Sequence, residues 1–215
     1  MKEKPSHALH VNDIPHDTLE AVKNGEYEVE VKYIIDTIPS EIEEGILQNK
    51  YEYRVIEQGY LRPTDKDGKF IRMRIRKSYH PNHGEEYRLT EKSGIKGSDV
   101  ARFEHEIPVE DKNTFDGIWS LTQGHRVHKT RYYIPYLHPE LNEEVTIELD
   151  IFHDALEGLV LAEVEFKVEG DDVKAAEARA EILRESPFGW FGLDVTGEKK
   201  WKNSQLAAKG LPKEE

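Results

Sequence analysis

Cysteine is absent from this chain of 215 residues, and so are long apolar runs. Without cysteine there are no disulfides and no thiolate chemistry, which is compatible with a reducing compartment. No apolar run is long enough to cross a bilayer, and the first residues, MKEKPSHALH, are polar and show no signal-peptide pattern. We therefore expect a soluble, cytoplasmic protein with no membrane partner.

Positive charge is in the minority. Lys and Arg number 30 against 43 Asp and Glu, which gives a formal net charge of −13 at pH 7. We therefore expect no nucleic acid as a general partner, because nucleic-acid binding depends on an excess of basic residues. The length suffices for one domain with a sizeable core. An acidic chain that binds a polyanion must do so through a local, enclosed group of basic residues.

Charged and apolar residues alternate in many segments of this chain. Glu28, Glu30 and Lys32 alternate with valines, so in a β-strand they share one face. The same period of two recurs in residues 69–79, 85–93, 100–109, 126–136, 143–153 and 158–168, and residues 51–61 read as a further strand. The pattern predicts seven strands with one apolar and one charged face, and residues 51–61 bring the number of strands to eight.

Two features of these strands favour a closed barrel. Their charged faces carry doublets of one sign, Arg-x-Arg or Glu-x-Glu, and the few helical segments cannot cover so many apolar faces. We predict a mainly β (α+β) fold: a closed antiparallel eight-stranded barrel with a charged lumen and a few flanking helices. Such a lumen is costly unless it is neutralised, and a bound polyanion bridged to the carboxylates by divalent metal would neutralise it.

The charged motifs follow one another in a fixed order. After Glu28-x-Glu30-x-Lys32 come Arg72-x-Arg74, Thr90-x-Lys92, Arg102-x-Glu104-x-Glu106, Lys129-x-Arg131, Glu148-x-Asp150-x-Phe152, Glu163-x-Glu165 and the tail Phe191-Gly192-x-Asp194-Val195-Thr196. This set resembles the CYTH superfamily, the triphosphate tunnel metalloenzymes. The resemblance covers about residues 26–210, which we take as the tunnel domain, and residues 1–25 are expected to be an N-terminal extension.

Binding of a triphosphate requires cations. Arg is suited to bidentate hydrogen bonds with phosphate oxygens, and Lys supplies a single point charge. The candidate phosphate-binding residues are Arg72, Arg74, Lys92, Arg102, Lys129 and Arg131. Arg76 shares the parity of Arg72 and Arg74, and both a lumen position and a solvent position are open for it. Two roles are open for Lys32: phosphate binding, or deprotonation of the attacking water.

The resemblance implies a Mg²⁺ or Mn²⁺ cofactor held by carboxylates. Glu28, Glu30 and Glu165 are the first choice of ligands. The second group comprises Glu163, Glu148, Asp150, Glu104 and Glu106, for each of which a salt bridge with a lumen cation is the alternative. We assign catalysis to Lys32, Glu28 and Glu30, with one metal holding the triphosphate and a second activating or orienting the water.

The resemblance also implies metal-dependent hydrolysis of a triphosphate. The tail and the single domain resemble the bacterial inorganic triphosphatase branch, which implies inorganic tripolyphosphate as substrate, cleaved to pyrophosphate and phosphate. A class IV-type adenylate cyclase and a thiamine triphosphatase are alternatives within the family. A non-catalytic polyphosphate- or nucleotide-binding protein and a lipocalin-like carrier are alternatives of another class. The expected partner is a small-molecule triphosphate, and the sequence leaves the oligomeric state open.

Overall fold

The computed structural model describes residues 26–61, 72–94, 98, 100–168 and 172–213. The predicted N-terminal extension, residues 1–25, lies outside these residues. The strands are β1 (Glu26–Ile34), β2 (Glu52–Leu61), β3 (Met73–His80), β4 (Gly84–Gly94), β5 (Ala101–Pro108), β6 (Arg126–His138), β7 (Glu143–Phe152) and β8 (Val160–Lys167). The helices are α2 (Ser40–Leu47), α3 (Lys112–Ser120), α4 (Val173–Glu185) and α5 (Asn203–Lys209), with short 3₁₀ helices η2 (Asp154–Leu156) and η3 (Lys199–Trp201).

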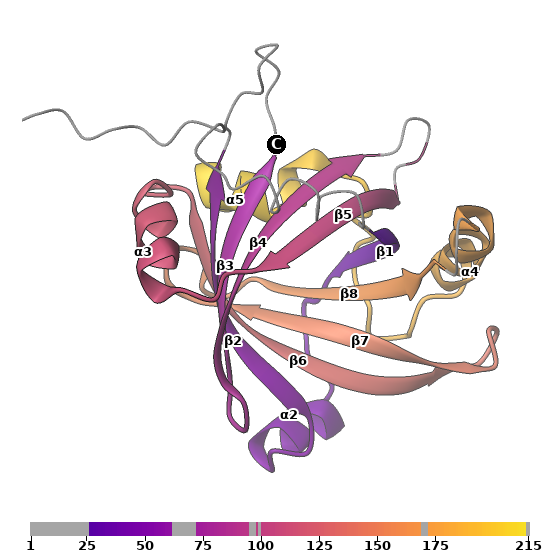
Figure 1. Ribbon diagram of the computed structural model, residues 1–215. Coiled ribbons are helices and arrows are strands. Elements are labelled where there is room, and N and C mark those ends of the chain that lie inside the picture. Colours follow the sequence, from indigo (N-terminus) through magenta and orange to yellow (C-terminus); the bar gives the residue numbers. More distant parts are fainter. Residues whose placement is uncertain (1–25, 62–71, 95–97, 99, 169–171, 214–215) are drawn as a thin grey trace, which may run out of the picture.

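The strands form one closed antiparallel barrel in the order β1-β5-β4-β3-β2-β6-β7-β8, and β8 pairs back onto β1 (Figure 1). This confirms the predicted fold class. Closure leaves no strand edge unpaired, so the alternation within each strand becomes a division between the lumen and the outer surface. Within the described ranges, no helix combines the length and the apolarity that crossing a membrane requires.

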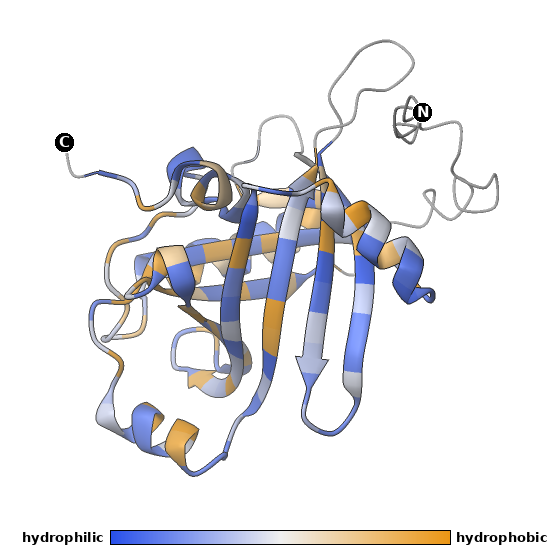
Figure 2. Cartoon of the chain, turned by 90° about the vertical axis from the view of Figure 1, so that its left-hand side faces the viewer, coloured by the Kyte–Doolittle hydropathy of each residue, from blue (hydrophilic) through white to orange (hydrophobic). Residues whose placement is uncertain are grey.

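Strand β1 shows how the alternation is used. Glu28, Glu30 and Lys32 line the lumen, whereas Val29 and Val31 point outward into the hydrophobic core and are fully buried. Hydrophilic and hydrophobic residues alternate along the barrel strands (Figure 2). The predicted parity is correct, and a lumen lined mainly by charged side chains does not fit the lipocalin-like alternative.

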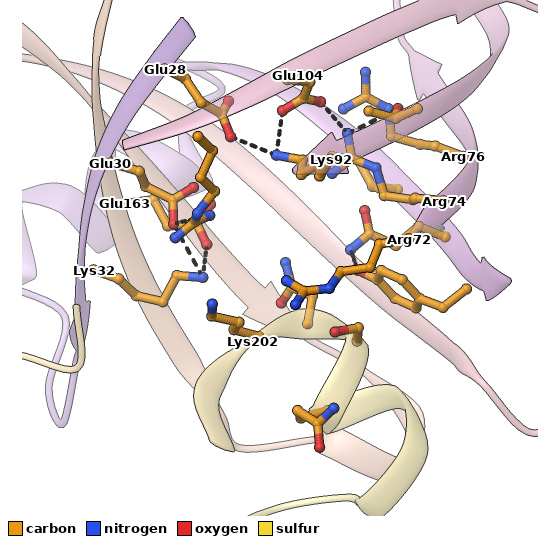
Figure 3. A pocket seen from close by; sticks show the side chains of 18 of the residues that line it. Glu28, Glu30, Lys32, Arg72, Arg74, Arg76, Lys92, Glu104, Glu163 and Lys202 are labelled. Atoms are coloured by element: carbon orange, nitrogen blue, oxygen red, sulfur yellow. Dashed lines mark hydrogen bonds and ion pairs between the residues drawn. The ribbon is translucent and has the colours of Figure 1, made fainter. Parts of the chain in front are cut away.

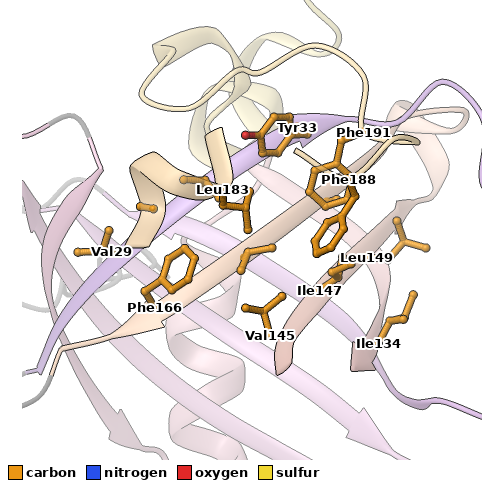
Figure 4. Close-up of a cluster of buried hydrophobic side chains, with 14 of the residues drawn as sticks. Val29, Tyr33, Ile134, Val145, Ile147, Leu149, Phe166, Leu183, Phe188 and Phe191 are labelled. Carbon is orange, nitrogen blue, oxygen red and sulfur yellow. The ribbon is translucent and has the colours of Figure 1, made fainter. Parts of the chain in front are cut away.

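The main hydrophobic core lies outside the barrel, where α4 packs on β1 and β8, and side chains of β7 together with Phe188 and Phe191 extend it (Figure 4). Ala176, Ala180 and Leu183 recur at helical spacing and form the buried face of α4. The helix begins at Asp172, whose side chain accepts a hydrogen bond from the Ala175 N–H at 3.1 Å. The same core contains Val29 of β1 and Val164 and Phe166 of β8, the two strands that α4 contacts most.

The chain that follows α4 is bonded to the end of β1. The N–H of Gly192 donates to the carbonyl of Ile34 at 3.0 Å, and the N–H of Val195 donates to that of Lys32 at 2.9 Å. Thr196 Oγ1 accepts a hydrogen bond from the Lys32 N–H at 2.9 Å. A Cβ at position 192 would lie 2.6 Å from the Ile34 oxygen, so only glycine allows this approach. The tail motif therefore fixes the backbone that presents Lys32 to the lumen.

Helix α5 lies at one end of the barrel. Its buried Leu206 packs in a second cluster with Val127 at the start of β6, Phe152 at the end of β7 and Leu161 at the start of β8. This contact places η3 and α5 beside the lumen, and Lys199, Lys200, Lys202 and Lys209 border it.

Candidate active site

The lumen holds a cavity of about 1930 Å³ (Figure 3). Its walls include sixteen Lys or Arg residues and eight Glu residues, although the whole chain carries a net charge of −13. The positive charge is therefore enclosed rather than spread over the surface. A concave wall of low dielectric focuses such a field, so the cavity attracts a compact polyanion.

Almost all of the predicted site residues meet in this cavity. Each predicted phosphate-binding residue borders it: Arg72, Arg74, Lys92, Arg102, Lys129 and Arg131. Lys32 borders it as well, and so do the predicted metal ligands Glu28, Glu30, Glu148, Glu163 and Glu165. Asp150 differs from them, because it is fully buried and lies behind the cavity wall.

One ion-pair network joins β1 to β4, β5 and β3. Lys92 Nζ donates to Glu28 Oε1 at 2.8 Å and also pairs with Glu104, which accepts from Arg74 Nη2 at 2.9 Å (Figure 3). Arg102 Nη1 donates to Glu30 Oε1 at 3.2 Å. Burial raises the pKa of Glu28, and Glu104 adds to the rise while Lys92 opposes it. Burial therefore disfavours the ionised form of Glu28, and an additional cation beside it would stabilise that form.

Arg131 is the centre of a second network, on β6, β7 and β8. Its Nε and Nη2 donate to the two carboxylate oxygens of Asp150, both at 2.7 Å, and Nη2 also donates to Glu163 at 2.5 Å. Nη1 bonds Glu148, and Asp150 in addition accepts from Lys129. Burial alone would raise the pKa of Glu163, but Lys32 and Arg131 hold it well below its usual value. Asp150 is thus engaged by two cations and holds both in place.

Lys32 is buried between two carboxylates. Its Nζ lies 2.6 Å from Glu163 Oε1 and 3.5 Å from Glu30 Oε1. Burial by itself would lower the pKa of Lys32, but Glu163 and Glu30 outweigh it, and the pKa is raised. Lys129 differs, because burial and the neighbouring Arg131 lower its pKa. Lys32 is therefore protonated at neutral pH, which favours the phosphate-binding role over the role of base.

Glu165 has carboxylates for neighbours. It lies directly opposite Glu30 in the β1–β8 pairing, and like charges in that relation are destabilising. Its side chain is open to the cavity, yet the surrounding protein limits its hydration. This desolvation, together with Glu28 and Glu148, raises the pKa of Glu165 to about 7. Within the described ranges it forms no ion pair.

These carboxylates have the donor chemistry for a hard divalent cation, which prefers oxygen ligands. In the described part of the chain, no three acidic or imidazole side chains are grouped closely enough to hold a metal as they stand. The reason is visible in the ion pairs: Lys92 engages Glu28, and Arg102 engages Glu30. The excess negative charge around Glu165 fits a divalent ion, which would take the place of those two cations.

Several lumen cations escaped the sequence reasoning, among them Lys202 and Arg54. Lys202, in the connection before α5, has its pKa lowered by burial and then by Arg102 and Arg72, so these cations share one end of the cavity (Figure 3). No strand alternation marks a residue in a connection. Arg54 on β2 was missed because its lumen-facing neighbours Ile56 and Gln58 are uncharged.

For Arg76 the structure decides between the two positions left open. It borders the cavity, and its Nη2 donates to Glu106 Oε1 at 3.0 Å. Burial, followed by the nearby Arg74, lowers its pKa to about 10. Arg88 on β4 also borders the cavity, on the same face of the strand as Thr90 and Lys92, as the alternation in residues 85–93 predicts.

A closed antiparallel barrel whose lumen attracts a polyanion defines a tunnel protein for highly charged ligands. The sequence profile of the CYTH domain matches residues 26–187, and the chain belongs to this family. It is 35% identical over 181 residues to an inorganic triphosphatase of Nitrosomonas europaea, covering 84% of this chain and 96% of the relative. It is 30% identical over 181 residues to an inorganic triphosphatase of Acetivibrio thermocellus, covering 83% and 92%.

The fold has a counterpart among solved structures. A crystal structure of an inorganic triphosphatase superposes with a TM-score of 0.51 at 31% identity, covering 86% of this chain and 97% of that chain. The resemblance inferred from the motif order is confirmed.

Proposed function

We propose that this protein is a divalent-metal-dependent inorganic triphosphatase that cleaves tripolyphosphate to pyrophosphate and phosphate. The observation that carries the proposal is an enclosed cationic lumen that also holds Glu28, Glu30 and Glu165 with too little compensating charge. Two inorganic triphosphatases that this chain matches over nearly their whole lengths support the choice of substrate. The tunnel domain proposed for residues 26–210 contains every residue of the site, and the cytoplasmic location stays a prediction.

The phosphates are bound, in this proposal, by cations at the α5 end and in the middle of the tunnel. Arg72 and Lys202 form no ion pair with any described residue, and each borders the cavity beside Arg102. Their donors are therefore available to a ligand. Arg74, Lys92, Lys129 and Arg131 are held in place by carboxylates and present their remaining donors to the same polyanion.

Glu28, Glu30 and Glu165 are the proposed ligands of Mg²⁺ or Mn²⁺. The metal, when bound, neutralises charge on the phosphoryl oxygens and orients the attacking water. Glu163 and Glu148 hold Lys32 and Arg131, and we assign them this positioning role. Asp150 lies behind the wall with both oxygens engaged, so we propose that it positions Arg131 and Lys129 rather than binding metal.

Tripolyphosphate is preferred over ATP because the lumen offers charge and little else. Three aromatic side chains of the described residues border the cavity: Tyr27, Tyr60 and Tyr133. The hydroxyl of Tyr60 already accepts a hydrogen bond from Gln58 at 2.6 Å, and Tyr27 packs edge-on against Phe103. A cyclase needs a base pocket and a ribose hydroxyl placed for attack, and a thiamine triphosphatase needs a thiazolium site. Among the described residues, no particular group of lumen side chains meets either need.

A phosphate-release assay tests the substrate. Tripolyphosphate, ATP, thiamine triphosphate and pyrophosphate are each assayed with Mg²⁺, with Mn²⁺ and with EDTA. We expect the highest kcat/KM for tripolyphosphate with metal, and low rates for pyrophosphate, which reaches fewer of the cations. Formation of cyclic AMP from ATP faster than release of phosphate from tripolyphosphate would make the protein a cyclase.

Substitution of the ligands tests the metal site. Glu28→Gln and Glu30→Gln are expected to fold but to lose metal-dependent turnover, because an amide binds a divalent cation far more weakly than a carboxylate. Glu185→Gln, on the exposed side of α4, is the matched control and should behave as the wild type. Normal turnover in either lumen variant would remove that residue from the ligand set.

A further inference from the structure

The barrel end away from α5 has its own group of arginines. Arg54 lies near the start of β2, whereas Tyr60, near the end of β2, packs against the cluster that contains Leu206 of α5. In the pairing of β2 with β6, Arg54 lies directly opposite Arg131, and in the pairing of β3 with β4, Arg76 lies directly opposite Arg88. Two like-charged pairs on the lumen side of neighbouring strands are destabilising unless anionic groups lie between them.

Two carboxylates serve these three peripheral arginines. Glu86 accepts from Arg54 Nη1 at 3.0 Å, and Glu106 accepts from Arg76 Nη2 at 3.0 Å and from Arg88 Nη1 at 3.2 Å. One positive charge is therefore left in excess. A guanidinium has five N–H donors, and within the described ranges Arg54 and Arg76 each donate to a side chain through a single nitrogen. The carboxylates orient the guanidinium groups without using up their donors.

The group is open both to the tunnel and to solvent. Arg54, Arg76 and Arg88 all border the same cavity as the α5-end cations. The side chains of Arg54 and Arg88 are 25% and 38% exposed, so a small anion reaches them from outside as well. Guanidinium groups suit tetrahedral oxyanions because two parallel N–H donors match two phosphate oxygens.

We propose that Arg54, Arg76 and Arg88 form a second oxyanion site, which binds inorganic phosphate at the tunnel mouth opposite α5. The site is separate from the phosphate-binding group around Arg72, Arg102 and Lys202. The identity of its ligand as a reaction product rests on the proposed function. A product anion bound there would leave by this mouth, while a new substrate enters at the α5 end.

Direct binding of inorganic phosphate tests the site without turnover. The metal-free protein, with EDTA, is titrated with phosphate by calorimetry and by ³¹P NMR. We expect two classes of site in the wild type. In the double variant Arg54→Gln/Arg88→Gln one class should weaken by about tenfold or more, as the loss of charge-assisted hydrogen bonds predicts. Arg179→Gln is the control, because Arg179 pairs with Glu143 on the outside of the barrel.

The results distinguish this site from the rest of the tunnel. Arg102→Gln should weaken the other class and leave the Arg54/Arg88 class intact. If the double variant does not fold, Arg54→Lys/Arg88→Lys keeps the charge and removes the paired donors, and it should bind phosphate with intermediate affinity. Wild-type stoichiometry and affinity in the Arg54/Arg88 variants, or a single class of site in the wild-type protein, would overturn the proposal.

The same titration separates this inference from the proposed function. Phosphate binding that depends on Arg54 and Arg88, in a protein that does not cleave tripolyphosphate, would leave the site standing and remove the function. If the protein cleaves tripolyphosphate but its phosphate binding does not depend on Arg54 or Arg88, the proposed function stands and the second oxyanion site is removed.

Discussion

Replacing Arg131 with Met keeps the alkyl stem of the side chain and removes a guanidinium that bonds Asp150, Glu163 and Glu148. Asp150 is fully buried and Glu163 is 4% exposed, so neither carboxylate gains water in exchange. Removal of one partner from a buried ion pair costs about 3–5 kcal/mol, because an uncompensated charge is left behind. Lys129 and Lys32 still contact these carboxylates, so we expect the lower end, about 3 kcal/mol.

The assay is urea unfolding at pH 7 in EDTA, which keeps metal from replacing the lost cation. Arg179→Met is the control. Arg179 pairs with Glu143 at 2.6 Å, but the two side chains are 39% and 36% exposed, and such a pair contributes about 0–1 kcal/mol. A loss at Arg131→Met no larger than that of the control would refute the reasoning that the lumen network is held by desolvated charge.

The pH dependence separates charge from packing. In the wild type the pKa of Glu163 is held well below its usual value, so its contribution is present above the unfolded pKa and is lost as the pH falls through the folded one. The wild type loses this contribution only below the unfolded pKa of about 4.5, so the deficit of Arg131→Met should keep its pH 7 size down to about pH 4.5 and shrink below that. A deficit that stays constant with pH would indicate lost packing instead.

Three further predictions concern Glu165, Arg72 and Gly192. Because burial and its acidic neighbours raise the pKa of Glu165 to about 7, its ionisation costs stability as the pH rises from about 4.5 through 7. The Tm of the metal-free protein should therefore fall over this pH range, and Mg²⁺ should restore it. In Glu165→Gln the dependence of Tm on pH should be flatter, and an unchanged dependence would contradict the assignment of this titration to Glu165. Arg72→Ala should lower kcat/KM for tripolyphosphate, because the lost charged hydrogen bond is worth about 2–3 kcal/mol of transition-state stabilisation. Steady-state kinetics measure this, and unchanged kinetics would show that Arg72 does not bind the substrate. Gly192→Ala should destabilise by about 1–3 kcal/mol in urea, because the new Cβ meets the Ile34 oxygen at 2.6 Å, while Gly189→Ala, with open space around it, should change little.

The alternation of charge made most of the barrel predictable. A strand allows only two faces, so the residues at 28, 30 and 32 had to share one of them, and β1 was assigned correctly from this rule. Arg74 on β3 was placed by the same rule, whereas the position of Arg76 was left open because it was expected near the strand end. Where the lumen side of a strand is uncharged, as around Arg54 on β2, the rule gives no indication.

The sequence by itself determined the number of strands and, for every strand with a charged face, which face lines the lumen and what charge it carries there, because these follow from a local period of two. Only the tertiary structure decided which charges meet. The register across strands puts Glu165 opposite Glu30 and places Arg131 among three carboxylates, and the contact of α5 with β6 and β7 brings Lys202 to Arg72 and Arg102. Pairing between distant segments depends on barrel closure and on packing outside the barrel, and neither is encoded in the spacing of residues along one strand.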